Sequence, residues 1–400
     1  MDMRMKVQIM ILLHQHLFRT IIFLFFLVLS IILLKDGRTP SNTRKKRRKY
    51  SIIEKIPDQV KELRLLVFTS NIHCINQTRM DINALMKLSY ILQHVGGLEH
   101  SRFVTVHEQV ALFLQVLAHH KKNRIVSNDF KRSGQTVSKY FNRVLAALLK
   151  LHLILLVTPE PIGDAETNEN WKHFRGCLGA VDETFITVRV ELTEKPKYRS
   201  RKGEIAVNVL SLCDRNCNFI YILSGWEGSA VDGRVLRDAV MRPNGFKVPS
   251  GNYYLCDGGY MNTTGFLTPY GGIRYHLKDW CEGRAAPQTP QEYFNTKHSR
   301  ARNVIEKAFG LLKTLWAALR SNTFYPIKVQ NRIIMACALL HNFIRTNMEI
   351  DPWELEVGDI FHGNEDDGFI SSLDPSVTWN NWRDNLANDM FTQYKHRRRA

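Results

Sequence analysis

The chain has few cysteines for its length. It contains seven in 400 residues, and they are scattered through the sequence as Cys74, Cys177, Cys213, Cys217, Cys256, Cys281 and Cys337. An odd, dispersed set excludes a dense disulfide framework and favours a reducing compartment. Cys213 and Cys217 have nearly the spacing of a zinc knuckle, but the sequence lacks a second Cys or His pair at a matching distance. The residues between them, Asp214-Arg215-Asn216, are typical of a hairpin turn, so we expect no zinc site.

Acidic residues are scarce relative to basic ones. There are 38 Asp and Glu against 55 Lys and Arg, which gives a formal net charge of +17 at pH 7. Such an excess favours a polyanionic partner, most simply nucleic acid, although it would also attract the chain to a membrane surface. Simple solubility is the plainer alternative. The 44% hydrophobic composition is that of a globular protein, and the length suffices for one large domain or two to three ordinary ones.

An apolar segment runs from Thr20 to Leu34. It is short for a bilayer span of about 20 residues, and no convincing small-residue cleavage site follows it, so a marginal membrane anchor and a signal-like segment both stay open. The basic cluster from Arg44 to Lys49 would keep the following chain in the cytosol if the segment inserted. That cluster also resembles a nuclear import signal or a solvated linker. We expect residues 1–50 to be a hydrophobic segment and a basic linker.

Residues 75–158 have the apolar spacing of helices. The segments from Asp81 to Leu98 and from His107 to His120 follow this spacing, and a third helical run from Thr136 to Leu145 comes after a turn that contains Gly134. A helix, a short turn and a second helix suggest a helix-turn-helix, and the alternative is a helical bundle with a polar, solvent-facing side. In a helix-turn-helix, these residues would be able to meet base edges or phosphates: Arg132, Gln135, Thr136, Ser138 and Lys139.

The pattern changes after the breaker segment that begins at Pro159. Runs of β-branched residues predict three strands, and then a helix, a fourth strand and a late helix follow. The expected elements are strands at 178–190, 205–212 and 219–223, a helix at 232–241 with its N-cap near Asp232, a strand at 253–256, and a helix at 303–319. We therefore expect an α/β domain over residues 170–345 and a C-terminal tail over residues 346–400.

Acidic residues recur at particular places in this order. Asp182 lies inside the first strand, Asp257 follows the fourth, and Glu306 lies in the first turns of the late helix. A central first strand beside the fourth would bring the three together at one end of the sheet. Asp182 is the most informative, because a carboxylate in a core strand costs free energy unless it is paired or bound to a cation. Asp257 as a turn residue and Glu306 as an exposed helix charge are the ordinary alternatives.

Clustered carboxylates suit a hard divalent cation, Mg²⁺ or Mn²⁺. Two such ions can activate water and stabilise the leaving oxygen in phosphodiester cleavage. In that scheme Asp182 bridges both ions, Asp257 holds one and Glu306 holds the other. Asp232 is either a fourth ligand or a helix cap.

Several motifs in order resemble the PIF/Harbinger transposase superfamily, close to its plant antagonist-of-like-heterochromatin-protein-like group. They are TRMDINALMKL, HEQVALFLQVLAHHKKNR, FKRSGQTVSKYF, GAVDETFI, YRSRKGEIAVNVLSLCD, GWEGSAVDGRVLRDAV, YYLCDGGY, FNTKHSRARNVIEKAFGLLK, LLHNFIR and WNNWRDNLANDMF. The resemblance implies that Asp182, Asp257 and Glu306 form a DDE triad, with Asp232 as a further metal-binding acid. It also implies an RNase H-like catalytic domain, a mixed β-sheet with flanking helices, after an all-α region. A nuclear location, DNA as substrate and a separate Myb/SANT-like partner follow from it as well.

One departure from the family pattern lies next to the first acid, where Glu183 replaces the usual small Gly. Because strand side chains alternate, we expect Glu183 to point to the face opposite Asp182 and to be tolerated. Two functions stay open: a metal-dependent DNA endonuclease or transposase, and a transposase-derived DNA- or chromatin-binding protein that no longer cuts. A protein anchored in a membrane by its N-terminal segment is a third alternative.

Overall fold

The structure is a computed structural model that describes residues 58–101, 104–243, 245–275, 286–348 and 376–399. The apolar segment from Thr20 to Leu34 and the basic cluster at residues 44–49 lie outside the described residues, so their roles stay predictions. Among the described helices, none combines the length and apolar character needed to cross a membrane. The described residues belong to one unit, residues 57–400.

The first part of the described chain is helical, as predicted. Its helices are α2 (Asp58–Val67), α3 (Asn71–Thr78), α4 (Ile82–His94), α5 (Val106–His119), α6 (Asn123–Asp129), α7 (Gly134–Lys150) and α8 (His152–Leu155). Helices α4, α5 and α7 are N-capped by Asp81, Thr105 and Ser133, respectively. Each capping side chain accepts a hydrogen bond from a first-turn N–H group, which would otherwise lack a partner. Helix α5 is almost wholly buried and contacts α3, α4, α6 and α7. This region therefore has its core around α5.

The following segment forms a mixed sheet with the strand order β3-β2-β1-β4-β5. Its strands are β1 (Cys177–Thr187), β2 (Ala206–Cys213), β3 (Phe219–Glu227), β4 (Tyr253–Leu255) and β5 (Phe266–Leu267). The first three form the predicted antiparallel meander, and β4 lies parallel beside the central β1. A mixed sheet with flanking helices, preceded by a helical region, is the RNase H-like α/β fold class that the sequence predicts.

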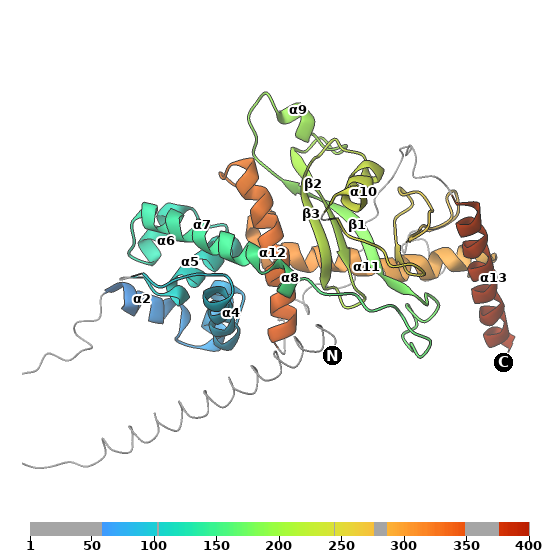
Figure 1. Cartoon of the computed structure of the whole chain (residues 1–400), viewed down its shortest axis with the longest axis horizontal. Coiled ribbons are helices and arrows are strands. Elements are labelled where there is room, and N and C mark those ends of the chain that lie inside the picture. The colour runs from blue at the N-terminus through green and yellow to red at the C-terminus, as the bar shows by residue number, and fades with distance from the viewer. Residues whose placement is uncertain (1–57, 102–103, 244, 276–285, 349–375, 400) are drawn as a thin grey trace, which may run out of the picture. The chain divides into compact units, whose positions relative to one another are not determined.

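Helices cover both faces of this sheet (Figure 1). On one face, α10 (Asp232–Met241) packs Val235 and Leu236 into a hydrophobic cluster with Val181 and Leu210 of the strands. On the other face, α11 (Pro290–Leu315) contacts β1, β2 and β4, and α12 (Ile327–Asn347) contacts β3 and α7. Because successive strand side chains point to opposite faces, neighbouring positions of β1 meet different helices.

The late helix is longer than predicted. It begins at Pro290 rather than near residue 303 and ends at Leu315, so Glu306 lies in its middle and not in its first turns. Thr289 caps the helix by accepting a 3.1 Å bond from the N–H of Glu292. Its first half is rich in polar side chains that are nevertheless buried, namely Asn295, Thr296, Lys297, His298 and Ser299. Apolar spacing could not reveal a helix that buries such residues.

Smaller differences concern element ends. The N-cap of α10 is Val231, and Asp232 is the first residue of the helix itself. The two-residue strand β5 was not expected, and the loop between β1 and β2 contains the short helix α9 (Lys195–Tyr198). Within the predicted C-terminal tail, α13 (Val377–Arg399) contacts α11. The cysteines in the described part of the chain are buried free thiols, in agreement with the absence of a disulfide framework.

Candidate active site

Asp182 lies near the middle of the central strand β1, opposite Ser211 of β2. Its residue surface is 8% exposed, so its charge is largely removed from water. One carboxylate oxygen accepts a 2.8 Å bond from the N–H of Glu183, and the other accepts a 2.6 Å bond from the Nη1 of Arg302. The cation required to offset burial of this strand carboxylate is therefore supplied by α11.

The other two acids of the predicted triad meet the same arginine. Asp257 follows β4, and its Oδ1 lies 3.5 Å from Arg302 Nη2. Glu306 lies one helical turn after Arg302, and its Oε1 is 2.5 Å from the same Nη2. The parallel pairing of β1 with β4 and the packing of α11 on both strands bring these segments together. We call Asp182, Asp257 and Glu306 the acid cluster.

Burial and mutual repulsion raise the pKa values of two acids of the cluster, Asp182 and Glu306, even beside Arg302. Burial raises the pKa of Asp182 to about 6, against the lowering effect of Arg302. Burial likewise raises the pKa of Glu306 to about 7, with further increases from Asp182 and Asp257. Although burial alone lowers the pKa of Arg302, Tyr275 and the three acids together raise it well above its usual value. The acid cluster is therefore an electrostatically strained group that attracts cations.

Arg302 is held in place from a second side. Its Nε donates a 2.7 Å bond to the hydroxyl of Tyr275, and its side chain is only 9% exposed. Sequence reasoning missed both residues. The available signal was the spacing of Arg302 and Glu306, because residues four apart share a helix face. Tyr275 carried no such signal, because it lies in a connection far from the motif acids in sequence.

Asp232 does not lie with the acid cluster. It is hydrogen-bonded to Glu183, whose side chain also accepts a 3.0 Å bond from the hydroxyl of Tyr260 and a bond from the amide of Asn208. Burial and then Asp232 raise the pKa of Glu183 well above its usual value, which favours the protonated form of Glu183. Glu183 thus points to the α10 face while Asp182 points to α11, the alternation expected from the sequence.

The donor set of the acid cluster fits a hard divalent cation in its chemistry. All three side chains offer carboxylate oxygens, which Mg²⁺ and Mn²⁺ prefer. The three carboxylates are, however, arranged around the guanidinium of Arg302. Among the described residues, no three His, Cys, Asp or Glu side chains lie close enough together to hold an ion without rearrangement. A bound ion would therefore require Arg302 to yield part of its contacts.

The predicted DNA-contacting residues occupy the turn between α6 and α7 and the start of α7. Gln135, Ser138 and Lys139 are exposed on one side of α7, and Thr136 is half-buried next to the cap residue. Arg132 is placed differently: its guanidinium forms two bonds, of 2.6 and 2.8 Å, to the buried carboxylate of Glu108 on α5. The structure thus brings four of the five together at the surface and commits Arg132 to the helical core.

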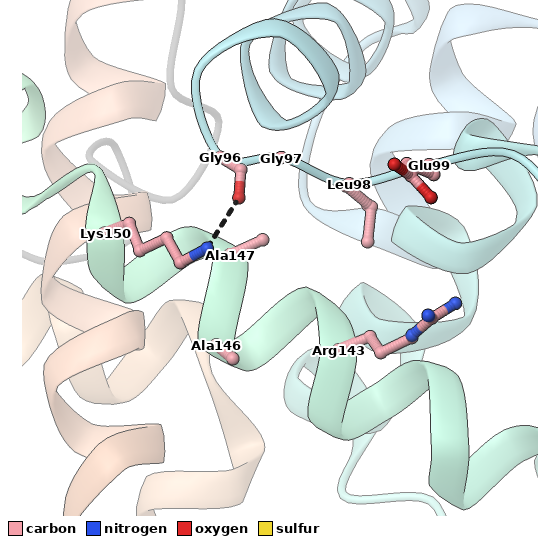
Figure 2. Close-up of a pocket in the computed structure, with 8 residues that line it drawn as sticks. All are labelled: Gly96, Gly97, Leu98, Glu99, Arg143, Ala146, Ala147 and Lys150. Carbon is pink, nitrogen blue, oxygen red and sulfur yellow. Dashed lines mark hydrogen bonds between the residues drawn. The ribbon is translucent and has the colours of Figure 1, made fainter.

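A pocket of about 190 Å³ lies further along α7 (Figure 2). Arg143 and Lys150 line it from α7, and Glu99 lines it from the segment after α4. Lys150 donates a 3.4 Å bond to the carbonyl of Gly96. A Cβ at Gly96 would lie 3.2 Å from that of Ala147 and 2.7 Å from the carbonyl of Leu92, so only glycine allows this close approach. The pocket is separate from the acid cluster.

Two parts of the chain match known protein families. Residues 181–342 match the family described as DDE superfamily endonuclease, and residues 62–150 match a domain of unknown function (DUF8040). The chain is similar to "Protein ALP1-like" of Arabidopsis thaliana, 25% identical over 259 residues that make up 60% of this chain and 61% of the relative. It is also similar to "Putative nuclease HARBI1" of Rattus norvegicus, 30% identical over 188 residues, 46% of this chain and 49% of the relative.

The same name belongs to a similar protein of Xenopus laevis, 24% identical over 174 residues, 42% of this chain and 46% of the relative. The matched part of the chain thus spans about half to three fifths of the length of these curated relatives. No solved structure matches the chain. Residues 181–342 therefore match a DDE superfamily endonuclease domain, and the chain is similar to the relatives named "Protein ALP1-like" and "Putative nuclease HARBI1".

Proposed function

We propose that the chain is a metal-dependent DNA endonuclease of the transposase type, with Asp182, Asp257 and Glu306 as its catalytic residues. The observation that carries this proposal is the convergence of three carboxylates, from β1, the end of β4 and α11, on the single guanidinium of Arg302. Three acids gathered around one cation, two of them with raised pKa values, are typical of a functional site. The match of residues 181–342 to the family described as DDE superfamily endonuclease supports the same assignment.

In this proposal the acid cluster holds divalent cations, Mg²⁺ or Mn²⁺, and we propose two. Bound there, the ions would lower the pKa of the attacking water and stabilise charge on the phosphoryl and leaving oxygens. The carboxylates of Asp182, Asp257 and Glu306 must be deprotonated to bind them. The water oxygen forms a new bond to phosphorus, the bond to the 3′ oxygen breaks, and the proton of the water passes to solvent or to the leaving oxygen.

Arg302 acts as a positioning residue in this scheme. It offsets the repulsion among the three carboxylates and keeps them directed toward one point. Asp232 stays a prediction as a fourth ligand. Its bond to Glu183 on the α10 side of β1 means that it would have to change partner to reach the acid cluster.

DNA is the proposed substrate, and α7 is the proposed contact element in the helical region. Its exposed side carries Gln135, Ser138 and Lys139 at the start and Arg143 one turn later, which suits phosphate and base-edge contacts. Thr136 lies next to them. Arg132 contributes by fixing the turn through Glu108 rather than by meeting DNA.

The cellular setting extends the proposal. The basic cluster at residues 44–49 and the relation to Harbinger-derived proteins support a nuclear location. A Myb/SANT-like partner that supplies additional DNA binding is part of the same proposal. Imaging of the tagged chain with and without residues 1–50 tests the location. A nuclear signal from the full chain supports this location, whether or not the chain without residues 1–50 also stays nuclear. A membrane pattern of the full chain contradicts it.

A second candidate function is DNA binding without cleavage. It is favoured by Arg302, because its guanidinium already neutralises the acid cluster and must yield contacts before a metal ion can bind. A chain that never exchanges this arginine for metal would keep the fold and the α7 surface but lose the chemistry. The two functions differ in one measurable property, which is the breakage of a phosphodiester bond.

Nicking of a supercoiled plasmid tests the proposal. We expect the purified chain to nick the plasmid in Mg²⁺ or Mn²⁺ and to be inactive with EDTA. Asp182→Asn, Asp257→Asn and Glu306→Gln should each abolish nicking, while circular dichroism shows that each variant is folded. Equal nicking by the wild type and all three variants would refute the proposal, and binding without any nicking would favour the second function.

A further inference from the structure

The loop between β1 and β2, residues 188–205, carries an unusual concentration of positive charge. From residue 195 to residue 202 its sequence is KPKYRSRK, with five cations and no acid. All five side chains are exposed: Lys195, Lys197, Arg199, Arg201 and Lys202. Acids flank this stretch, with Glu191 and Glu194 before it and Glu204 after it. We call residues 195–202 the basic loop. Like charges gathered on one short exposed segment repel each other unless a polyanion binds there.

The basic loop has a defined backbone. Arg199 pairs with Ile205 in an isolated antiparallel bridge, and the N–H of Ser200 donates a 2.8 Å bond to the carbonyl of Glu204. The carbonyl of Lys197 accepts a 3.2 Å bond from the N–H of Ser229 after β3. A Cβ at Gly228 would lie 2.5 Å from the carbonyl of Tyr198, so the loop and the end of β3 are in close contact. The cations are therefore presented from an anchored support at the end of the β1–β2 hairpin (Figure 1).

The basic loop continues the strand that carries the first catalytic acid. The part of β1 from Asp182 to the end of the strand at Thr187 is about 17 Å long, at about 3.3 Å per residue. Successive phosphates of one DNA strand are separated by about 3.4 Å along the helix axis. A duplex that follows β1 away from the acid cluster would therefore reach the end of this strand, beyond which the loop extends, after about five nucleotides.

Lys313 lies between the acid cluster and the basic loop. It is on α11 two turns after Glu306, and seven residues bring a helical side chain back to nearly the same face. Its Nζ donates a 2.8 Å bond to the hydroxyl of Thr184, on the same side of β1 as Asp182. Burial lowers the pKa of Lys313, and Glu204 and Lys202 of the loop region also act on it. The positive charge thus continues from α11 to the loop on the α11 side of β1.

We propose that the basic loop is a DNA-binding element of the nuclease domain, which holds the phosphate backbone of a duplex at least about five nucleotides from the bond that the acid cluster cuts. This inference rests on the proposed function and deepens it, because it states where the substrate runs. The side chains of Lys197, Arg199 and Lys202 contact phosphates and carry no sequence information. Together with α7, the basic loop gives the chain two separate DNA contacts.

The test compares two triple variants of the full chain with the same change in net charge. The loop variant carries Lys197→Gln, Arg199→Gln and Lys202→Gln, and the control carries Lys61→Gln, Arg64→Gln and Lys87→Gln, which are exposed cations on α2 and α4. Binding to a labelled duplex is measured in EDTA at several salt concentrations. Three lost phosphate contacts should reduce the slope of log K against log salt by about 2.7. The loop variant should also bind about tenfold or more weakly at 0.1 M salt, whereas the control keeps the wild-type slope.

Equal slopes for the loop variant and the control would overturn the inference, as would a wild-type chain that binds no duplex. Plasmid nicking is measured in parallel with the same proteins. A wild type that nicks, together with unchanged slopes, refutes the basic loop alone. A reduced slope for the loop variant, together with a wild type that never nicks, supports the basic loop and refutes the proposed nuclease activity.

Discussion

Arg302 offers the sharpest test of how the acid cluster is stabilised. Its guanidinium is 9% exposed and lies within 2.6 Å of Asp182 and Glu306 and 3.5 Å of Asp257. The substitution Arg302→Gln removes the positive charge and keeps a polar side chain. The buried Asp182 and the half-buried Asp257 and Glu306 are then left without their shared cation.

The expected loss follows from the ion pairs. Removal of one partner of a buried pair costs about 3 to 5 kcal/mol. The acids can escape part of this cost by taking up protons, because the pKa of Asp182 is already about 6 and that of Glu306 about 7. We therefore expect the free energy of unfolding of Arg302→Gln to fall by about 3 kcal/mol at pH 7.5, the lower end of that range. The loss should shrink near pH 5.5, where protonation removes the repulsion.

Urea unfolding with EDTA and with excess Mn²⁺ measures this effect. A divalent cation can replace the missing charge, so Mn²⁺ at 100 times its Kd should stabilise Arg302→Gln by about 2.7 kcal/mol. The same Mn²⁺ concentration should stabilise the wild type less, because Arg302 must first yield contacts there. Arg300→Gln is the matched control, because Arg300 is exposed on the same helix and should change stability by less than about 0.5 kcal/mol. If Arg302→Gln unfolds like Arg300→Gln, or if Mn²⁺ has no greater effect on it than on the wild type, the electrostatic account of the acid cluster is wrong.

Two further predictions concern protonation and the helical region. Asp182 and Glu306 are protonated below their raised pKa values of about 6 and about 7. Mn²⁺ affinity measured by calorimetry should therefore rise as the pH increases from 5.5 to 7.5 and then level off. An affinity independent of pH over this interval would contradict the assignment of these acids as metal ligands. Arg132→Gln should lower the free energy of unfolding by about 3 to 5 kcal/mol, since it leaves Glu108 buried without its partner. Lys139→Gln should instead leave stability nearly unchanged and weaken DNA binding, and the reverse pattern would mean that Arg132 is the DNA contact.

The sequence was most informative where a residue contradicts its surroundings. Asp182 could be assigned because an acid inside a run of core strand residues requires a partner. Asp257 and Glu306 were predicted from the strand order and from the family resemblance. The parallel pairing of β1 and β4 confirms the strand order, and the catalytic roles of these residues stay a prediction. Their proximity depends on contacts between distant segments, so it could be inferred from topology but not measured before the structure.

The partners of the acids could not be predicted in the same way. An arginine on a helix is usually solvated, so the spacing of Arg302 and Glu306 indicated at most that these two side chains pair, and not that Arg302 is buried beside Asp182 and Asp257. The bond between Glu183 and Asp232 joins a strand to a helix about fifty residues later, and only the packing of α10 brings them together. The early turns of α11 were missed for a related reason, because polar residues such as Asn295 and His298 are buried there through hydrogen bonds to the carbonyls of neighbouring segments.

The most direct measurement compares two neighbouring acids that point to opposite faces of β1. Supercoiled plasmid is incubated in Mg²⁺ or Mn²⁺ with the wild type, Asp182→Asn and Glu183→Gln, each verified as folded. If the acid cluster is the cutting centre, Asp182→Asn abolishes nicking and Glu183→Gln retains it. The reason is that Glu183 bonds to Asp232 and Tyr260 on the other face of the strand. Nicking that survives in Asp182→Asn, or that is lost only in Glu183→Gln, would contradict the central claim.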